Sequence, residues 1–176
     1  INRGDEVIII SPYWVSYPEI IKLCGGKPKV LNTKRREGFS INTEKWEKLI
    51  TSKTKWIILN SPNNPTGVVY SPETIKKLVL LLRKYTDIWI LSDDIYEKIV
   101  YDNFQFSTIA SLFPKHKNRI LTVNGVSKAY SMTGWRLGWS FWPEHLVEHV
   151  NKLLINSVSC VNAAAQYAGI AALDGP

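Results

Sequence analysis

Short runs of β-branched and apolar residues alternate along the chain with segments of helical periodicity, and this alternation limits the possible folds more than any other feature. Strand-like runs occupy residues 6–10, 29–32, 56–59, 88–91, 120–123 and 136–142. Helical patterns lie between or after them, at residues 18–24, 43–50, 71–85, 143–155 and 163–173. Strands that alternate with helices form a mostly parallel sheet with helices on both faces. The sequence therefore predicts an α/β fold.

The helix expected after residue 70 has the clearest start signal. Ser71 offers a hydroxyl cap, Pro72 suits the first helical position, and Glu73 lies near the positive end of the helix dipole.

The chain has 176 residues, the size of one ordinary domain, and no internal repeat or low-complexity linker divides it. It begins at Ile1 without an initiator Met. We expect one domain over residues 1–176, incomplete at both ends.

Composition argues against several partners. Apolar residues make up 45% of the chain, but no run approaches the ~18 apolar residues of a membrane span. The net charge of +7 would suit a polyanion, yet the basic residues are scattered and their longest cluster is Lys34-Arg35-Arg36. We therefore expect neither a membrane nor a nucleic acid as partner.

Cysteine and histidine give no metal or disulfide pattern. Cys24 and Cys160 lie far apart and fit neither kind of spacing, so a reducing cytoplasm is the default location. His145 and His149 are four residues apart in an expected helix and could bind a metal. A solvated helix face is the favoured interpretation, because no carboxylate or cysteine pattern supports a metal.

Unusual polar residues follow directly after four of the predicted strands. In open α/β sheets, ligands bind beyond the carboxyl ends of the strands, so these groups could converge on one crevice. The four groups are Ser11-Pro12-Tyr13-Trp14, Asn60-Ser61-Pro62-Asn63-Asn64-Pro65-Thr66-Gly67, Ser92-Asp93-Asp94-Ile95-Tyr96 and Asn124-Gly125-Val126-Ser127-Lys128.

Each group also has a purely structural interpretation. The segment NSPNNPTG is a strong turn former, because its prolines fix φ and its Asn and Gly residues tolerate left-handed backbone. Asp93 could cap a helix, Tyr96 could fill the core, and Lys128 could be an ordinary surface lysine. Trp14 could likewise be core filling, and Arg136 could form an ordinary ion pair. Taken together, the structural interpretations are less convincing than each is alone. All four polar groups occupy the same position, directly after a predicted strand.

The segments NSPNNPTG, SDDIYE and VNGVSKAYSMTGWRLGW, in this order and spacing, resemble the fold-type I aminotransferases. The likeness is strongest to the class I aspartate aminotransferase subgroup and covers essentially the whole chain. Its most specific part is Lys128 after a strand, followed by Thr-Gly-Trp-Arg, with Arg136 eight residues beyond the lysine. The resemblance implies that residues 1–176 form most of the large domain that binds pyridoxal 5′-phosphate (PLP), without the small domain.

The resemblance also implies roles for polar residues around the cofactor ring. Asp93 matches the carboxylate that pairs with the protonated pyridine nitrogen, which favours the charged ring. Asp94 is the weaker candidate, because the family's acid lies three residues before the tyrosine. Tyr96 and Asn64 match the two donors to the cofactor's phenolic oxygen, and Asn64 is also expected to contact substrate.

Three further residues complete the set that the resemblance implies. Trp14 matches the aromatic residue that stacks on the pyridine ring and borders the substrate. Arg136 matches the arginine that grips the phosphate with its two-pronged guanidinium. Lys128 would form the internal aldimine and then, as a free amine, act as general base and acid.

The implied activity is transamination with ping-pong kinetics. An amino group would pass from an amino acid, with aspartate the family's commonest donor, to a 2-oxo acid such as 2-oxoglutarate. Prephenate or aromatic acceptors also remain open. The resemblance further implies a homodimer.

Two positions depart from the pattern of many relatives. Position 125 is glycine where many relatives have a serine that binds the phosphate, so that hydroxyl contact is lost. Position 17 is tyrosine where some relatives have a histidine that supports the pyridine-binding aspartate, which leaves that supporting role open.

Two other classes of function compete with transamination. A lyase or an aminocyclopropane-carboxylate synthase type would share Lys128, Asp93 and Arg136. A non-catalytic sensor domain of a regulator would need a DNA-binding module such as a helix-turn-helix, and the sequence contains none.

Overall fold

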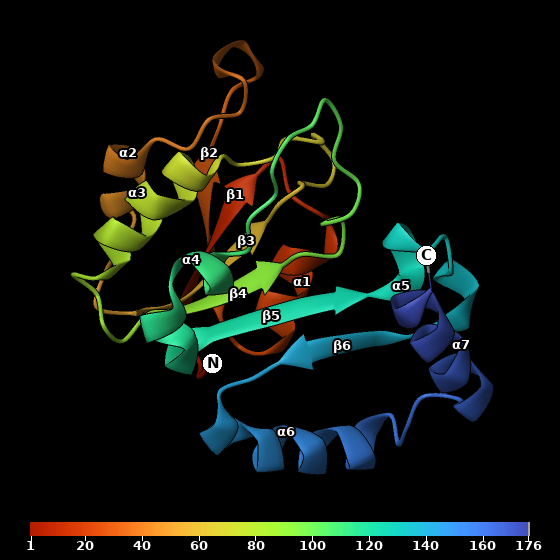
Figure 1. Cartoon of the computed structure of the whole chain (residues 1–176). Helices are drawn as coiled ribbons and strands as arrows, with labels where there is room; N and C mark the ends of the chain where they lie inside the picture. The colour runs from red at the N-terminus through yellow and green to blue at the C-terminus, as the bar shows by residue number, and fades with distance from the viewer. Residues whose placement is uncertain (176) are drawn as a thin grey trace.

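The computed structural model describes residues 1–175, and within them six strands form one sheet in the order β2-β1-β3-β4-β5-β6 (Figure 1). The strands are β1 (Glu6–Ser11), β2 (Lys27–Asn32), β3 (Thr54–Asn60), β4 (Trp89–Asp93), β5 (Ile120–Gly125) and β6 (Gly138–Phe141). All neighbouring pairs are parallel except β5 and β6. The predicted mostly parallel sheet is therefore confirmed.

The helices include all five that periodicity predicted, together with others. The predicted ones are α1 (Ser16–Leu23), α2 (Thr43–Glu47), α3 (Pro72–Leu82), α6 (Glu144–Ser157) and α7 (Ala163–Asp174). The additional ones are α4 (Ile109–Leu112), α5 (Val126–Ala129) and the 3-10 helices η1 (Arg35–Glu37), η2 (Pro114–Arg119) and η3 (Thr133–Trp135). Each of these additional helices has six residues or fewer. No helix within residues 1–175 is long and apolar enough to cross a membrane.

The start of α3 agrees with its sequence signal. The Ser71 hydroxyl accepts a hydrogen bond from the backbone N–H of Thr74 at 3.2 Å, and Pro72 occupies the first turn. The predicted helix over residues 43–50 is shorter than expected, because the regular α2 ends at Glu47.

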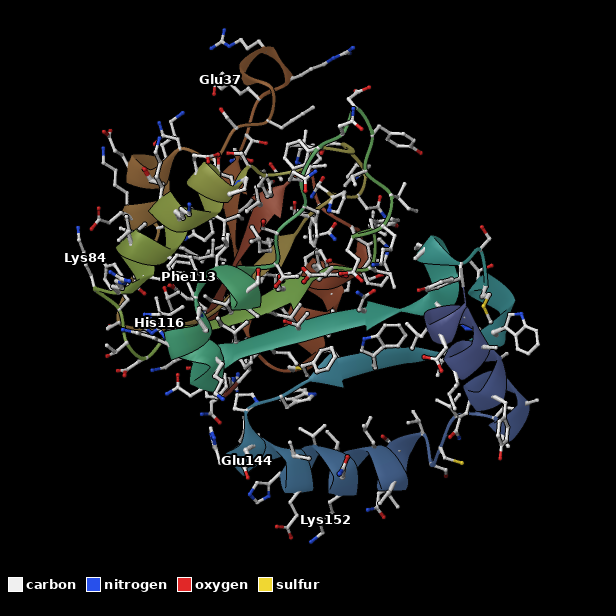
Figure 2. The ribbon with its side chains drawn as sticks, in the orientation of Figure 1. Glu37, Lys84, Phe113, His116, Glu144 and Lys152 are labelled. Atoms are coloured by element: carbon white, nitrogen blue, oxygen red, sulfur yellow. The ribbon has the colours of Figure 1, made fainter. Side chains whose placement is uncertain are left out.

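Apolar side chains cover both faces of the sheet, as the alternation predicted. On one face, α2, α3 and α4 bury a large cluster that includes Trp46, Leu78 and Ile90. On the other face, Tyr17 and Ile21 of α1 pack against β1 and β3 in a smaller cluster. Figure 2 shows that the turn carrying Glu37 projects from the body of the molecule.

The last strand differs from its prediction at one end. The sequence predicts a strand over residues 136–142, whereas β6 begins at Gly138. Arg136 instead has left-handed backbone, with φ 52° and ψ 42°, directly after η3. This conformation is uncommon for a residue with a side chain, and it turns the chain from η3 toward the antiparallel β6. The strand-like sequence pattern of residues 136–142 therefore includes two residues of the turn that precedes β6.

Gly125 is the last residue of β5, and the start of β6 approaches it closely. It pairs with Gly138 across the antiparallel ladder. A Cβ atom at position 125 would lie 2.8 Å from the carbonyl oxygen of Leu137 and 3.1 Å from the Cα of Gly138. Because both neighbours are backbone atoms, the space cannot open without moving the strand. The packing therefore explains the absence of a serine at this position.

We predict that Gly125→Ser lowers the free energy of unfolding by roughly 1–3 kcal/mol, the usual cost of forcing extra atoms into a packed site. Urea denaturation measures the change. The matched control is Gly134→Ser, because a Cβ at position 134 would meet no atom within 4 Å. Equal stability of the two variants would contradict the crowding argument.

Candidate functional site

A pocket of about 390 Å³ lies where β3, β4 and β5 end. Small-molecule sites in proteins usually measure roughly 300 to 1,000 Å³. All six side chains singled out from the sequence line this pocket, namely Trp14, Asn64, Asp93, Tyr96, Lys128 and Arg136. They come from the segments that follow four different strands, so the predicted convergence of these segments is present in the structure.

Strand register brings the polar strand ends together. In the parallel ladder, Asn60 pairs with Asp93, and Asp93 pairs with Val123 on the next strand. β3 and β4 therefore end at the same level, β5 continues to Gly125, and the segments that follow the three strands line one pocket. This edge of the sheet is where ligands bind in open α/β folds.

Asn60 connects two of these loops, a role that the sequence reasoning did not assign. Its Nδ2 donates to the Asp93 carbonyl at 2.9 Å, and its Oδ1 accepts from the Asn64 backbone N–H at 2.8 Å. The Asn64 amide in turn donates to the Tyr96 hydroxyl at 3.3 Å. Asn60 was visible only as the first residue of the polar run after β3. Its amide fixes the turn that carries Asn64 relative to the end of β4.

Asp93 lies at the end of β4 with its carboxylate partly buried. The Tyr17 hydroxyl donates to Oδ2, and the Ile95 backbone N–H donates to Oδ1 at 3.3 Å. Burial raises the pKa of Asp93, and these two hydrogen bonds oppose that rise. Burial also raises the pKa of Tyr17, and the neighbouring Asp93 charge adds to the effect. Tyr17 therefore stays protonated and is the donor in this pair.

The two cations of the pocket come from the segment after β5. The Lys128 Nζ lies 5.8 Å from the centre of the Tyr96 ring, within reach of a cation–π contact. The Arg136 Nη1 donates to the Thr133 carbonyl at 2.9 Å. Within residues 1–175, neither cation forms an ion pair with an acidic side chain. Both therefore retain donors for an anionic or carbonyl ligand.

Trp14 completes the pocket from the segment after β1. Its ring meets the Tyr17 ring edge to face, with centroids 5.4 Å apart and planes at 89°. The indole is 43% exposed, so Trp14 is not core filling. An aromatic face at the mouth of the pocket can cover a flat ligand.

The family model for class I and II aminotransferases matches residues 1–176. The chain belongs to this family. An aspartate aminotransferase of Rhizobium meliloti (strain 1021) is 47% identical over 176 residues, which is all of this chain and 43% of the relative. A probable aspartate/prephenate aminotransferase of Rickettsia conorii is also 47% identical, over 100% of this chain and 44% of the relative.

Solved structures agree with the sequence relatives. The crystal structure of the aspartate aminotransferase from Rhizobium meliloti superimposes with a TM-score of 0.96 at 46% identity, over 100% of this chain and 44% of that one. The chain thus spans less than half the length of these relatives.

The structure shows the surroundings of positions 125 and 17, where the sequence departs from the pattern of many relatives. A side chain at position 125 would crowd the backbone, for the reason given above, but the hydroxyl-bearing Ser127 and Thr133 line the same pocket. Tyr17 contacts the Asp93 carboxylate directly. The pocket therefore has polar groups close to both positions.

Asp94 is separated from the pocket although it follows Asp93 in sequence. Its side chain is buried, accepts a hydrogen bond from the Ser92 hydroxyl at 2.6 Å, and does not line the pocket. Its Oδ2 has no hydrogen-bond partner within residues 1–175. Burial raises the pKa of Asp94 to about 7, with smaller contributions from Glu97 and Asp93. The geometry thus favours Asp93 over Asp94 as the pocket carboxylate.

We predict that Asp94 makes stability depend on pH. Because the folded protein holds its proton more tightly than the unfolded chain, the free energy of unfolding falls as pH rises from about 4 toward about 7, by roughly 2–4 kcal/mol. Asp94→Asn removes this slope, which urea titrations at a series of pH values measure. The exposed Asp87→Asn controls for net charge, and an unchanged slope in Asp94→Asn would contradict the assignment.

Proposed function

We propose that the chain is the cofactor-binding large domain of a PLP-dependent aminotransferase, over residues 1–176 of a longer enzyme. The observation that carries the proposal is the pocket itself. One crevice collects a carboxylate, an amide, a phenol, an indole, a primary amine and a guanidinium from the ends of separate strands. Belonging to the class I and II aminotransferases supports the same conclusion.

The groups present are chemically suited to PLP. Asp93 offers a carboxylate that can accept the N–H of a protonated pyridine. Tyr96 and Asn64 form a hydrogen-bonded pair of donors suited to the phenolic oxygen. Arg136 offers a guanidinium for the phosphate, and Trp14 offers an aromatic face for the ring. When bound, PLP supplies an electron-accepting ring that stabilises negative charge on the substrate Cα.

Lys128 is the residue that would do the proton chemistry. Among the described residues that line the pocket, Lys128 alone carries a primary amine. Its Nζ would hold the cofactor covalently at the aldehyde carbon, with loss of one water, while no substrate is bound. When free, the same nitrogen would accept a proton from the substrate Cα and donate it again, which is the proton transfer that transamination requires. The Tyr96 ring near Nζ would help to hold the amine in place.

The substrate proposal depends on the relatives. Proteins 47% identical to this chain are named aspartate or aspartate/prephenate aminotransferases. We therefore propose aspartate as amino donor and 2-oxoglutarate as acceptor, with prephenate as a second acceptor to be tried. We also propose a homodimer, because the family resemblance implies it, and a cytoplasmic location, because that is the default for a chain without a disulfide pattern.

We predict that the full-length protein binds PLP with a visible absorption band and that aspartate shifts this band toward that of the aminated cofactor. Lys128→Ala should abolish covalent attachment, because no other amine lines the described pocket. Borohydride reduction followed by mass spectrometry of the labelled peptide measures attachment independently of turnover.

The control for this experiment is Lys98→Ala, which removes an exposed lysine from the loop after β4. Labelling that survives in Lys128→Ala would assign the amine elsewhere. A band that aspartate leaves unchanged, together with release of pyruvate and ammonia from an amino acid that carries a β leaving group, such as cysteine, would favour a lyase.

We predict that Arg136→Ala weakens PLP retention by roughly tenfold to a hundredfold, since hydrogen bonds to charged groups contribute about 1.5–3 kcal/mol each. Equilibrium dialysis measures retention. Binding of pyridoxal, which lacks the phosphate, should change little in the same variant. Equal losses for the two compounds would contradict the phosphate role.

A further inference from the structure

Tyr17 reaches the pocket from an element that the sequence motifs do not include. It lies in the first turn of α1 and is 76 residues away from Asp93 in sequence, yet its hydroxyl donates to the Asp93 Oδ2. The side chain is only 7% exposed and packs in the smaller apolar cluster, beside Val7 and Ile9 of β1. The phenol is therefore held by packing on one side and by a carboxylate on the other.

The contact leaves Asp93 with acceptor capacity for a ligand. A carboxylate can accept about four hydrogen bonds. Within residues 1–175, its side chain accepts one from Tyr17 and one from the Ile95 N–H, the latter at 3.3 Å. No cation forms an ion pair with it there, although Lys128 and Arg136 line the same pocket. The carboxylate is thus oriented by a neutral donor and not neutralised by a positive charge.

The same ring also contacts Trp14, edge to face. Tyr17 therefore connects two residues that the proposed function places against opposite parts of the cofactor ring, Asp93 at its nitrogen and Trp14 on its face. The hydroxyl serves the first contact, and the ring serves the second. A substitution that removes only the hydroxyl can separate them.

We propose that Tyr17 is a positioning residue that orients the Asp93 carboxylate toward the pyridine N–H of the cofactor. The proposal depends on the function proposed above. Tyrosine differs here from an imidazole, because it adds no positive charge beside the aspartate. The full negative charge of Asp93 is then available to the protonated ring.

The test compares two cofactors in two proteins. The full-length wild type and Tyr17→Phe are titrated with PLP and with its 1-deaza analogue, in which carbon replaces the ring nitrogen. We expect Tyr17→Phe to weaken PLP binding roughly tenfold while leaving the analogue's affinity within about twofold, because the analogue has no N–H for Asp93. The phenylalanine keeps the ring contact with Trp14.

Two controls isolate the hydroxyl. Tyr70→Phe removes a second buried tyrosine hydroxyl outside the pocket and should leave both affinities unchanged. In an Asp93→Asn background, Tyr17→Phe should have no further effect on PLP, because the partner through which it acts is already altered.

Equal weakening of both cofactors by Tyr17→Phe would mean that the phenol only packs, and it would overturn the proposal. Unchanged binding of both would overturn it as well. Either result, with wild-type PLP still attached at Lys128, leaves the proposed function intact. Failure of the wild type to bind either compound would overturn the proposed function, and the role of Tyr17 with it.

Discussion

The parallel hydrogen-bonded register of β3, β4 and β5 is the constraint on which the pocket depends. It sets Asn60, Asp93 and Val123 side by side, so the segments that follow the three strands begin at neighbouring positions along one edge of the sheet. Parallel sheets in proteins almost always have helices on both faces. Here α2, α3 and α4 cover one face, and α1 packs on the other at β1 and β3. The apolar core therefore supports the geometry of a polar site.

The pocket separates its charges along the sheet edge. The carboxylate lies at the end of β4 and is fixed by Tyr17 from α1 and by Ile95 from its own loop. The amine and the guanidinium lie beyond β5, without an ion-pair partner within residues 1–175. A ligand with a basic nitrogen at one end and an anion at the other would match this separation. PLP has that distribution of charge, which is why we favour it as the cofactor.

The close approach of β5 and β6 shows how packing limits the chemistry of a site. Gly125 faces backbone atoms of Leu137 and Gly138, so a serine there would force this backbone to shift. The antiparallel strand is in turn possible because Arg136 adopts left-handed backbone at the end of η3. One turn therefore both positions the guanidinium in the pocket and starts the strand that excludes a side chain at position 125.

The sequence by itself determined the element types, their order and the segments that meet, because periodicity and turn residues record local backbone preference and burial. It also identified the six pocket side chains, since family motifs retain their spacing. The true start of β6, the linking role of Asn60 and the contact of Tyr17 with Asp93 were decided by the tertiary structure. Each depends on distances between segments far apart in the chain, such as α1 and β4. Local patterns carry no information about those distances, because strand register and helix packing set them.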